Sequence, residues 1–157
     1  MPRVAISLGS NLGNRREHLA RALEELGALL QNVRASDPIE TEPHDVPEPQ
    51  PPYLNMAATG ETSLTPEALI AKLLEIEKRG GRRRRLPKAA RTIDLDVILY
   101  NDRTITTPAV SVPHPRFRIR RFVLEPLVTI AADWVDPVTG RTVRQLLDDL
   151  NEKEKGA

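Results

Sequence analysis

The sequence of 157 residues contains no cysteine, which excludes disulfide bonds, thiolate catalysis and cysteine-ligated zinc. It also lacks an apolar run of membrane-spanning length and the layout of a signal peptide, so we expect a cytoplasmic protein with no membrane partner. A net charge of +1 provides no global attraction to nucleic acid. The hydrophobic content of 39% and the length predict one globular domain, residues 1–157.

Two acids stand inside an apolar run that extends from Arg91 to Tyr100. Strand alternation places Asp94 and Asp96 on one face, with carboxylates roughly 6–7 Å apart along the chain. Alternation assigns Ile98 and Tyr100 to the same face, and Ile93, Leu95, Val97 and Leu99 to the other. Paired oxygen ligands beside apolar residues favour Mg²⁺. The alternative is an exposed edge strand with solvated acids, although Asp is depleted in strands.

Basic segments flank this strand on both sides. Residues 80–91 combine two glycines, one proline and six cations, which indicates a mobile basic loop, and residues 114–121 form a second basic run. The planar guanidinium of arginine suits phosphate oxygens, so acids for a metal with arginines nearby match polyphosphate chemistry. Without the acids, the same runs would indicate a solvated or nucleic-acid-binding patch.

The remaining chain predicts alternating strands and helices. Asn14 and Glu17 resemble a capping box that starts a helix, and Thr65 with Pro66 starts another, which Gly80 ends. Strands are predicted at 4–8, 33–39, 53–62 and 91–100, a stiff proline-rich loop covering a site at 40–52, a short segment at 104–107, an extended piece at 110–115, helices at 122–132 and 143–150, a turn at 136–140 and a polar tail at 151–157. The order to residue 100 is β-α-β-β-α-β, which predicts an α+β ferredoxin-like fold: an antiparallel sheet with helices on one face, followed by additional C-terminal helices.

Three features have open interpretations. Tyr53 and Asn55 share a strand face, where they could stack on and hydrogen-bond a planar heterocycle, or serve as a core residue and a turn former. Glu77 lies at the edge of an apolar helix stripe, where a solvent-facing side chain is favoured over a contact at a pocket rim. The turn at residues 9–14 lacks a Walker lysine, so a plain tight turn is favoured over an anion cradle.

Six ordered motifs give the chain a family resemblance. They are Gly9-Ser10-Asn11-Leu12-Gly13, Glu40-Thr41-Glu42-Pro43, Tyr53-Leu54-Asn55, Arg91-Thr92-Ile93-Asp94-Leu95-Asp96, Val112-Pro113-His114-Pro115 and Arg121-Phe122-Val123-Leu124-Glu125-Pro126-Leu127. In this order they resemble 6-hydroxymethyl-7,8-dihydropterin pyrophosphokinases, which transfer pyrophosphate from ATP to a pterin alcohol in folate biosynthesis. The resemblance implies an ATP-dependent transferase that uses Mg²⁺, with two ions expected, and acts on small molecules as a monomer.

The resemblance also implies residue roles. Asp94 and Asp96 match the metal-binding carboxylates, and Arg82 and Arg91 match arginines of a mobile catalytic loop. The predicted ATP contacts are Arg84, Ser111, His114 and Arg120, with Glu77 assigned to the same site. The predicted pterin contacts are Thr41, Pro43, Tyr53, Asn55 and Phe122, the two aromatic rings forming a sandwich.

Departures from the family pattern keep alternatives open. Lys88-Ala89-Ala90 replaces a Trp-Gly-Pro run of the catalytic loop, and Leu74 replaces a glutamine near the adenine. Because four arginines follow one another, from Arg82 to Arg85, the sequence leaves open which of them plays each role in the loop. A catalytically inactive relative is one alternative. An RRM-like RNA-binding module is another, although an aromatic content of 3% is low for base stacking.

Overall fold

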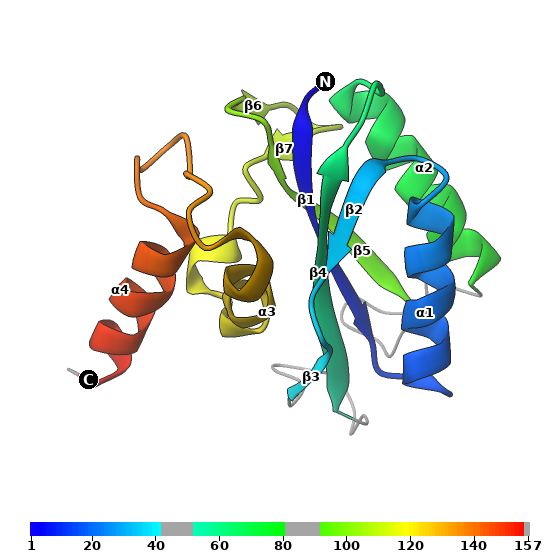
Figure 1. Cartoon of the computed structure of the whole chain (residues 1–157), viewed down its shortest axis with the longest axis horizontal. Helices are drawn as coiled ribbons and strands as arrows, with labels where there is room; N and C mark the ends of the chain where they lie inside the picture. The colour runs from blue at the N-terminus through cyan, green and yellow to red at the C-terminus, as the bar shows by residue number, and fades with distance from the viewer. Residues whose placement is uncertain (42–51, 81–91, 156–157) are drawn as a thin grey trace.

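The computed structural model describes residues 1–41, 52–80 and 92–155 (Figure 1). The strands are β1 (Arg3–Ser10), β2 (Gln31–Ala35), β3 (Ile39–Thr41), β4 (Tyr53–Glu61), β5 (Asp94–Tyr100), β6 (Ile105–Thr106) and β7 (Ser111–Val112). The helices are α1 (Arg15–Leu26), α2 (Pro66–Arg79), α3 (Arg121–Ala131) and α4 (Val143–Lys155), with a 3₁₀ turn, η1, at Phe117–Ile119.

The main sheet has the strand order β2-β4-β1-β5, and β3 also pairs with β4. All of these pairs are antiparallel, and β1 lies in the centre between β4 and β5. β6 and β7 form a separate two-stranded sheet. Each helix of the first hundred residues connects two strands that have a third strand between them, as in a split βαβ unit. The predicted ferredoxin-like α+β fold is confirmed.

Helices cover both faces of the sheet. α1 and α2 lie together on one side of it and α3 and α4 on the other (Figure 1). On the first face, β1 contributes Val4, Ile6 and Leu8 to a core shared with α1 and α2. On the second face, Ala5 of β1 and Ala57 of β4 pack with α3 and α4. Helices on one face were predicted for the first hundred residues, and the C-terminal helices form the second layer.

The predicted helix starts are confirmed by their side-chain caps. The Asn14 side chain accepts a hydrogen bond from the Glu17 backbone N–H at 3.2 Å and donates one to the Glu17 carboxylate at 3.0 Å. Thr65 accepts the Ala68 backbone N–H at 3.2 Å, and Pro66 occupies the first position of α2. Both arrangements satisfy amide groups that a helix start leaves without an intrahelical partner.

The strict alternation predicted for β5 is wrong beyond Ile98. Ile6 pairs with Val97 and Ala5 pairs with Leu99, so the register passes over Ile98. Tyr100 consequently packs with the α1–α2 core and Leu99 with the α3–α4 core, the reverse of the predicted faces. A one-residue irregularity exchanges the faces of every residue after it. Asp94 and Asp96 precede the irregularity and keep their shared face.

Two predicted boundaries also differ. The strand predicted at 33–39 is two short strands, β2 and β3, whose register with β4 is interrupted. The polar tail predicted from Asn151 is wrong up to Lys155, because α4 continues to that residue. Arg121 donates hydrogen bonds to Asn151 and Glu154, so polar contacts with α3 hold the last turns of α4.

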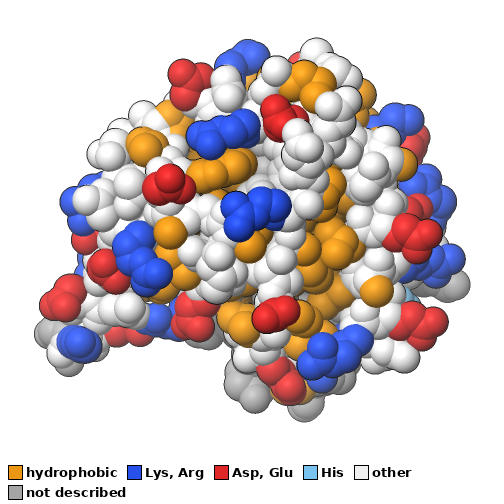
Figure 2. All heavy atoms as spheres, viewed as in Figure 1, with side chains coloured by type: hydrophobic (Ala, Val, Ile, Leu, Met, Phe, Trp, Pro, Cys, Tyr) orange, Lys and Arg blue, Asp and Glu red, His pale blue; other side chains and the backbone are white. Residues whose placement is uncertain are grey.

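The molecular surface shows Lys and Arg side chains interspersed with Asp and Glu on the face drawn in Figure 2. Over the part of the chain that the structure describes, no helix combines the length and apolarity needed to span a membrane.

Candidate active site

Two rows of side chains cross the second face of the sheet. Gly9 of β1 pairs with Asn55 of β4 on one side and with Asp94 of β5 on the other. Ser7 pairs in the same way with Ala57 and Asp96. Because laterally paired residues share a face, Asn55, Asp94 and Asp96 all lie on the face that α3 covers. Adjacent strands are about 4.8 Å apart, so the amide and the nearer carboxylate stand about two strand spacings from each other.

Gly9 leaves an open position in the first of these rows. A Cβ atom built on it would lie 2.8 Å from Asn55 Oδ1 and 3.4 Å from the Tyr53 ring. Both side chains therefore lean over the β1 backbone. The missing side chain leaves room for the Asn55 amide and the Tyr53 ring above the strand that separates them from the acids.

The orientation of Asn55 is set by Thr41 at the end of β3. Asn55 is 3% exposed, and its Nδ2 donates a hydrogen bond of 2.6 Å to the Thr41 hydroxyl. With the NH₂ group used in this way, Oδ1 faces Gly9 as an acceptor. Thr41 and half-buried Tyr53 pair directly in the β3–β4 ladder, so three of the predicted pterin contacts lie together.

His114 lies beside the acidic strand. Its backbone N–H donates to the Ile98 carbonyl at 2.9 Å, and its Nδ1 accepts the Arg116 N–H at 3.1 Å. Burial, with smaller contributions from the charges of Arg120 and Arg116, lowers the pKa of His114 to about 4, against the opposite effect of Asp94. The imidazole is consequently neutral at pH 7. With Nδ1 as an acceptor, Nε2 carries the proton and can donate to a ligand oxygen.

Arg120 and Phe122 bracket the start of α3. Arg120 caps this helix through its backbone, and its guanidinium lies 5.5 Å from the centroid of the Phe122 ring. Phe122 is half-buried and packs against the α3–α4 core. Ser111 pairs with Thr106 in the β6–β7 sheet, and β7 contacts β5. The predicted contacts on the nucleotide side that the structure describes are therefore spread along one segment, from Ser111 to Arg120, that borders β5.

Glu77 is not solvent-facing, so the favoured interpretation of this residue is wrong. It is 2% exposed, and its carboxylate accepts the backbone N–H of Leu95 at 2.8 Å. Leu95 stands between Asp94 and Asp96, so the contact joins α2 to the acidic strand. Thr92 donates to the carbonyl of Gly80 at 2.5 Å, which brings the end of α2 next to the start of β5.

Four predicted site residues fall outside the residues that the structure describes. They are Pro43, Arg82, Arg84 and Arg91. The Thr92–Gly80 hydrogen bond nevertheless shows that the residues bordering segment 81–91 lie side by side near Asp94. The roles of the four residues stay predictions.

The acidic pair fits a hard divalent cation. Asp94 and Asp96 are half-buried on one face, with the buried Ser7 hydroxyl in the row between them and β4. Among residues 1–41, 52–80 and 92–155, no set of three His, Asp or Glu side chains forms a metal cage. Mg²⁺ usually takes one or two protein carboxylates and completes its shell with water and phosphate oxygens. Two carboxylates, completed by phosphate oxygens of a ligand, are therefore the donor set expected for Mg²⁺.

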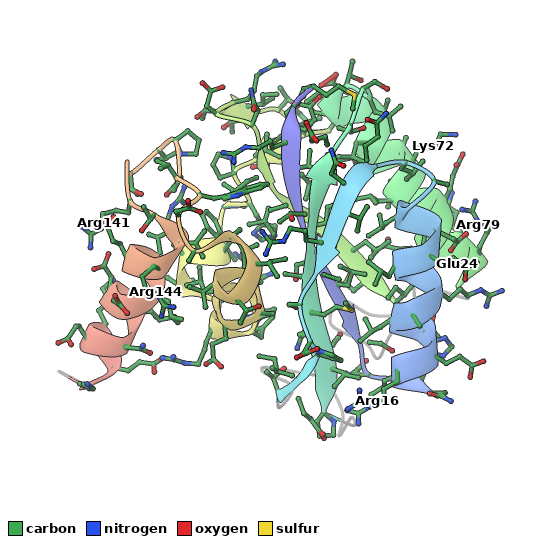
Figure 3. All side chains as sticks on the ribbon, in the orientation of Figure 1. Arg16, Glu24, Lys72, Arg79, Arg141 and Arg144 are labelled. Atoms are coloured by element: carbon green, nitrogen blue, oxygen red, sulfur yellow. The ribbon has the colours of Figure 1, made fainter. Side chains whose placement is uncertain are left out.

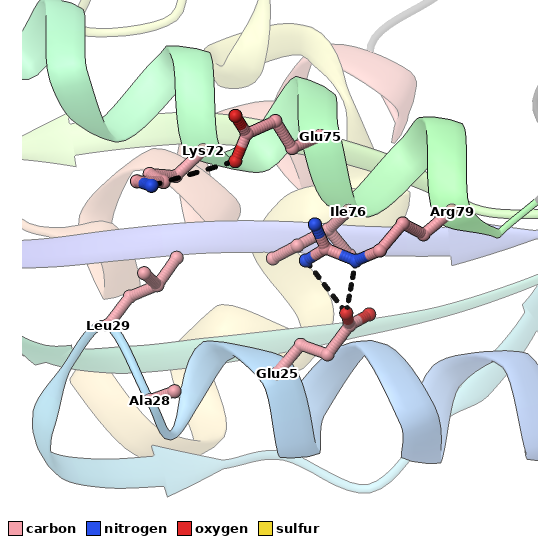
Figure 4. Close-up of a pocket in the computed structure, with 7 residues that line it drawn as sticks. All are labelled: Glu25, Ala28, Leu29, Lys72, Glu75, Ile76 and Arg79. Atoms are coloured by element: carbon pink, nitrogen blue, oxygen red, sulfur yellow. Dashed lines mark hydrogen bonds and ion pairs between the residues drawn. The ribbon is translucent and has the colours of Figure 1, made fainter.

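A pocket of about 250 Å³ lies elsewhere, between α1 and α2 (Figure 4). Arg79 binds Glu25 at 2.8 Å and Lys72 lies 3.7 Å from Glu75, so the charges along the pocket already have partners. The helices that form it cover the face of the sheet opposite to Asp94 and Asp96. The sheet therefore separates this pocket from the acidic strand.

Comparison with known proteins decides the family. Residues 5–132 match the sequence profile of the 7,8-dihydro-6-hydroxymethylpterin-pyrophosphokinase (HPPK) family. The chain belongs to the HPPK family. The resemblance inferred from the six motifs is confirmed, and the RNA-binding alternative is not favoured.

Curated HPPK proteins resemble the chain over most of its length. It is 38% identical over 150 residues to 2-amino-4-hydroxy-6-hydroxymethyldihydropteridine pyrophosphokinase of Synechocystis sp., covering 94% of this chain and 76% of that protein. It is 33% identical over 145 residues to the Aquifex aeolicus protein of the same name, covering 92% of this chain and 90% of that protein. It also matches 20% of the longer folic acid synthesis protein fol1 of Pneumocystis carinii at 38% identity.

Solved HPPK structures share the fold at low sequence identity. The wild-type HPPK-DHPS of Plasmodium falciparum superposes with a TM-score of 0.78 at 13% identity, covering 99% of this chain and 46% of that one. A crystal structure of an HPPK-DHPS in complex with substrates gives a TM-score of 0.74 at 12% identity, covering 99% of this chain and 44% of that one.

The sequence did not predict the structural roles of Gly9 and Glu77. Gly9 belongs to a recognised motif, but only its pairing between Asn55 and Asp94 shows why a side chain is absent there. Glu77 occupies a helix position that usually faces solvent. The sequence signal for its burial is its place directly after Ile76, on the edge of the buried stripe of α2.

Proposed function

We propose that this HPPK protein transfers a pyrophosphoryl group from ATP to the hydroxymethyl group of 6-hydroxymethyl-7,8-dihydropterin, forming the pterin diphosphate and AMP in folate biosynthesis. One observation carries the proposal in this chain: Asn55 and Asp94 flank Gly9 on the same face of the sheet. In this row, an oriented amide that can bind a heterocycle lies two strands away from a pair of carboxylates that can bind a metal.

The pterin side is assigned to β4 and its neighbours. Asn55 Oδ1 accepts a ring N–H of the pterin, and the open position at Gly9 admits the ring. Tyr53 and Phe122 stack on its two faces, while Thr41 and Pro43 line the edge. The Asn55–Thr41 hydrogen bond of 2.6 Å supports this assignment, since it holds the acceptor ready before the ligand arrives. A ring without a donor there would leave a buried carbonyl oxygen unpaired.

The nucleotide side is assigned to the segment from Ser111 to Arg120, together with Arg84. His114 donates from Nε2, Arg120 supplies positive charge, and Ser111 and Arg84 complete the contacts with ATP. The lowered pKa of His114, to about 4, supports a neutral donor. Glu77 supports the same site from behind, because its carboxylate accepts the Leu95 N–H between Asp94 and Asp96.

Asp94 and Asp96 are proposed to hold Mg²⁺, with two ions expected in the complex with ATP. When bound, such ions neutralise triphosphate charge and lower the pKa of the attacking hydroxyl. The protein aligns the two substrates on the sheet, which is the larger part of what phosphoryl-type transfer requires of it.

The reaction exchanges one P–O bond for another. The pterin hydroxymethyl oxygen forms a bond to the β-phosphorus while the bond from that phosphorus to the α,β-bridging oxygen breaks. The hydroxyl proton passes to solvent, and AMP departs with the bridging oxygen. Arg82 and Arg91 are proposed to neutralise the charge that develops and to exclude water. Their place in sequence, between the adjacent residues Gly80 and Thr92, supports a loop that closes near Asp94.

We further propose that the chain acts as one domain and as a cytoplasmic monomer. Both proposed substrates are small molecules, so the reaction requires neither nucleic acid nor membrane. Sedimentation velocity with and without ATP tests the monomer, and a stable dimer in both conditions would contradict it.

The experiment that tests the function separates the products by HPLC after incubation with ATP, Mg²⁺ and the pterin alcohol. We expect AMP and pterin diphosphate in equal amounts, with no AMP when the pterin alcohol is omitted or EDTA is added. ADP with a pterin monophosphate would indicate an ordinary kinase and contradict the proposal. Absence of product from a folded protein would favour the inactive relative.

A further inference from the structure

A buried carboxylate in the turn before α4 holds the segment that carries Arg120. Asp136 is 0% exposed and receives two hydrogen bonds from the Arg118 guanidinium, at 2.5 and 2.9 Å. The Val138 N–H and the Thr139 hydroxyl donate to the same carboxylate, at 3.0 and 2.7 Å. Burial alone would raise the pKa of Asp136, but these hydrogen bonds and the charge of Arg118 outweigh it and hold the pKa below its usual value.

Arg118 lies in η1, between His114 and Arg120. The Arg120 N–H donates to the Phe117 carbonyl at 3.2 Å, so the position of Arg120 follows from that of the turn. The turn is attached to the protein by the fully buried ring of Phe117 and by the pair between Arg118 and Asp136, whereas Ile119 is 65% exposed. A bidentate guanidinium–carboxylate pair restricts rotation as well as distance.

The pterin side has a separate anchor. Arg121 starts α3 and donates to Asn151 and Glu154 of α4, with Glu125 at 3.5 Å. Phe122 follows on the same helix. Arg120 lies against the Phe122 ring, but Phe122 is itself packed against the α3–α4 core. Loss of the Arg118–Asp136 pair would therefore loosen Arg120, and His114 through its backbone contact with Phe117, while α3 and its Phe122 stay held against α4.

We propose that Asp136 is a positioning residue for the nucleotide site: through Arg118 it fixes the η1 turn so that Arg120 and His114 meet the phosphates of ATP. The inference rests on the proposed function and deepens it. Asp136 lies in a turn between α3 and α4, and its own carboxylate is occupied by Arg118 and the turn, so it acts through Arg118 and not on the substrate.

The test compares Asp136→Asn with a matched control, Asp149→Asn. Asp149 also accepts two hydrogen bonds from an arginine, Arg141, at 3.0 and 2.7 Å. That pair joins the same turn to α4 without touching η1, and Arg141 points outward at the edge of the molecule (Figure 3). Dissociation constants are measured by calorimetry for α,β-methylene-ATP with Mg²⁺, and by fluorescence for the pterin alcohol, well below each variant's Tm.

We expect Asp136→Asn to weaken the binding of the ATP analogue about tenfold, the size of effect that the loss of one charged hydrogen bond produces, and to leave pterin affinity within about twofold. Asp149→Asn should change neither. In steady-state assays the KM for ATP should rise more than kcat falls. Arg118→Lys keeps the charge but not the two-point contact, so it should weaken binding of the ATP analogue less than Asp136→Asn does and also leave pterin affinity unchanged. It replaces Asp136→Asn in the test if that variant does not fold.

Equal weakening of both ligands would show a general structural role and overturn the inference, as would unchanged ATP affinity in a folded Asp136→Asn or Arg118→Lys protein. Failure of the proposed function looks different, because the unmodified protein would then bind neither ligand. In that case the inference falls with it.

Discussion

The side-chain amide of Asn55 donates a hydrogen bond of 2.6 Å to the hydroxyl of Thr41, from one strand of the β3–β4 pair to the other. This bond leaves the carbonyl oxygen of Asn55 above Gly9, where a ligand N–H can reach it. In the proposed pterin site, Thr41 would therefore act by orienting Asn55 and not by touching the reacting atoms.

Thr41→Val should reduce pterin affinity about threefold to tenfold, because Asn55 loses the partner that fixes its orientation, a loss of about 1 kcal/mol. Fluorescence titration with the pterin alcohol measures the effect. Thr129→Val is the matched control, since Thr129 is exposed on α3 and bonds within its own turn to Pro126. Equal affinity in Thr41→Val and the unmodified protein would remove Thr41 from the site.

Gly9→Ala should weaken pterin binding more than it weakens folding. The added Cβ would lie 2.8 Å from Asn55 Oδ1, which is the far end of a side chain and can move aside at the expense of its orientation. We expect a loss of at least about tenfold in pterin affinity, corresponding to about 1.4 kcal/mol, with a smaller change in unfolding free energy. A variant with normal affinity would show that the ligand does not lie against β1.

Glu77→Leu should destabilise the protein by about 1–3 kcal/mol, because the buried Leu95 N–H would lose its acceptor. Glu77→Gln retains an acceptor and should be milder. Urea unfolding measures both, with Glu75→Leu, at an exposed position of the same helix, as the control. If Glu75→Leu and Glu77→Leu were equally stable, the contact would contribute nothing.

Stability should fall as the pH is lowered from about 6.5 towards 4. The folded pKa of His114 is about 4, so over this interval an unfolded chain with an ordinary imidazole binds a proton that the folded chain does not. Above about pH 6.5 His114 is neutral in both the folded and the unfolded chain, so it imposes no cost on folding. Between that pH and the folded pKa, the unfolding free energy should fall by about 1–2 kcal/mol, after allowance for solvent at a half-buried side chain.

Urea unfolding at pH 7 and pH 5 in EDTA tests this pH dependence. His114→Gln, which cannot titrate, should lose less stability than the unmodified protein between the two values. The lowered pKa of Asp136 does not interfere, because it affects stability only below its ordinary value near 3.8. Identical pH dependence in both proteins would contradict a buried neutral His114.

The sequence was sufficient for the parts of the fold that depend on local rules. Asn14 and Thr65 cap helices as such residues commonly do, and the alternation around Asp94 and Asp96 placed both acids on one face. The motifs and their order were sufficient to indicate the family.

What the sequence could not provide depends on contacts between distant segments. The register change opposite Ala5 and Ile6 arises in the pairing of two strands, so alternation within β5 alone misplaced Tyr100. The polar end of α4 is helical because Arg121, thirty residues earlier, binds Asn151. Asp136 was predicted only as part of a turn, because its partner, Arg118, is brought to it by the packing of η1.

The central claim is that Asp94 and Asp96 hold the divalent ions to which ATP binds. Its most direct test is a Mn²⁺ titration followed by electron paramagnetic resonance, in the presence of saturating α,β-methylene-ATP and the pterin alcohol. We expect two protein-dependent Mn²⁺ ions in the unmodified complex and the loss of at least one in Asp94→Asn and in Asp96→Asn, with turnover reduced by orders of magnitude and the fold retained. Unchanged Mn²⁺ binding with near-normal AMP formation in both variants would contradict the account.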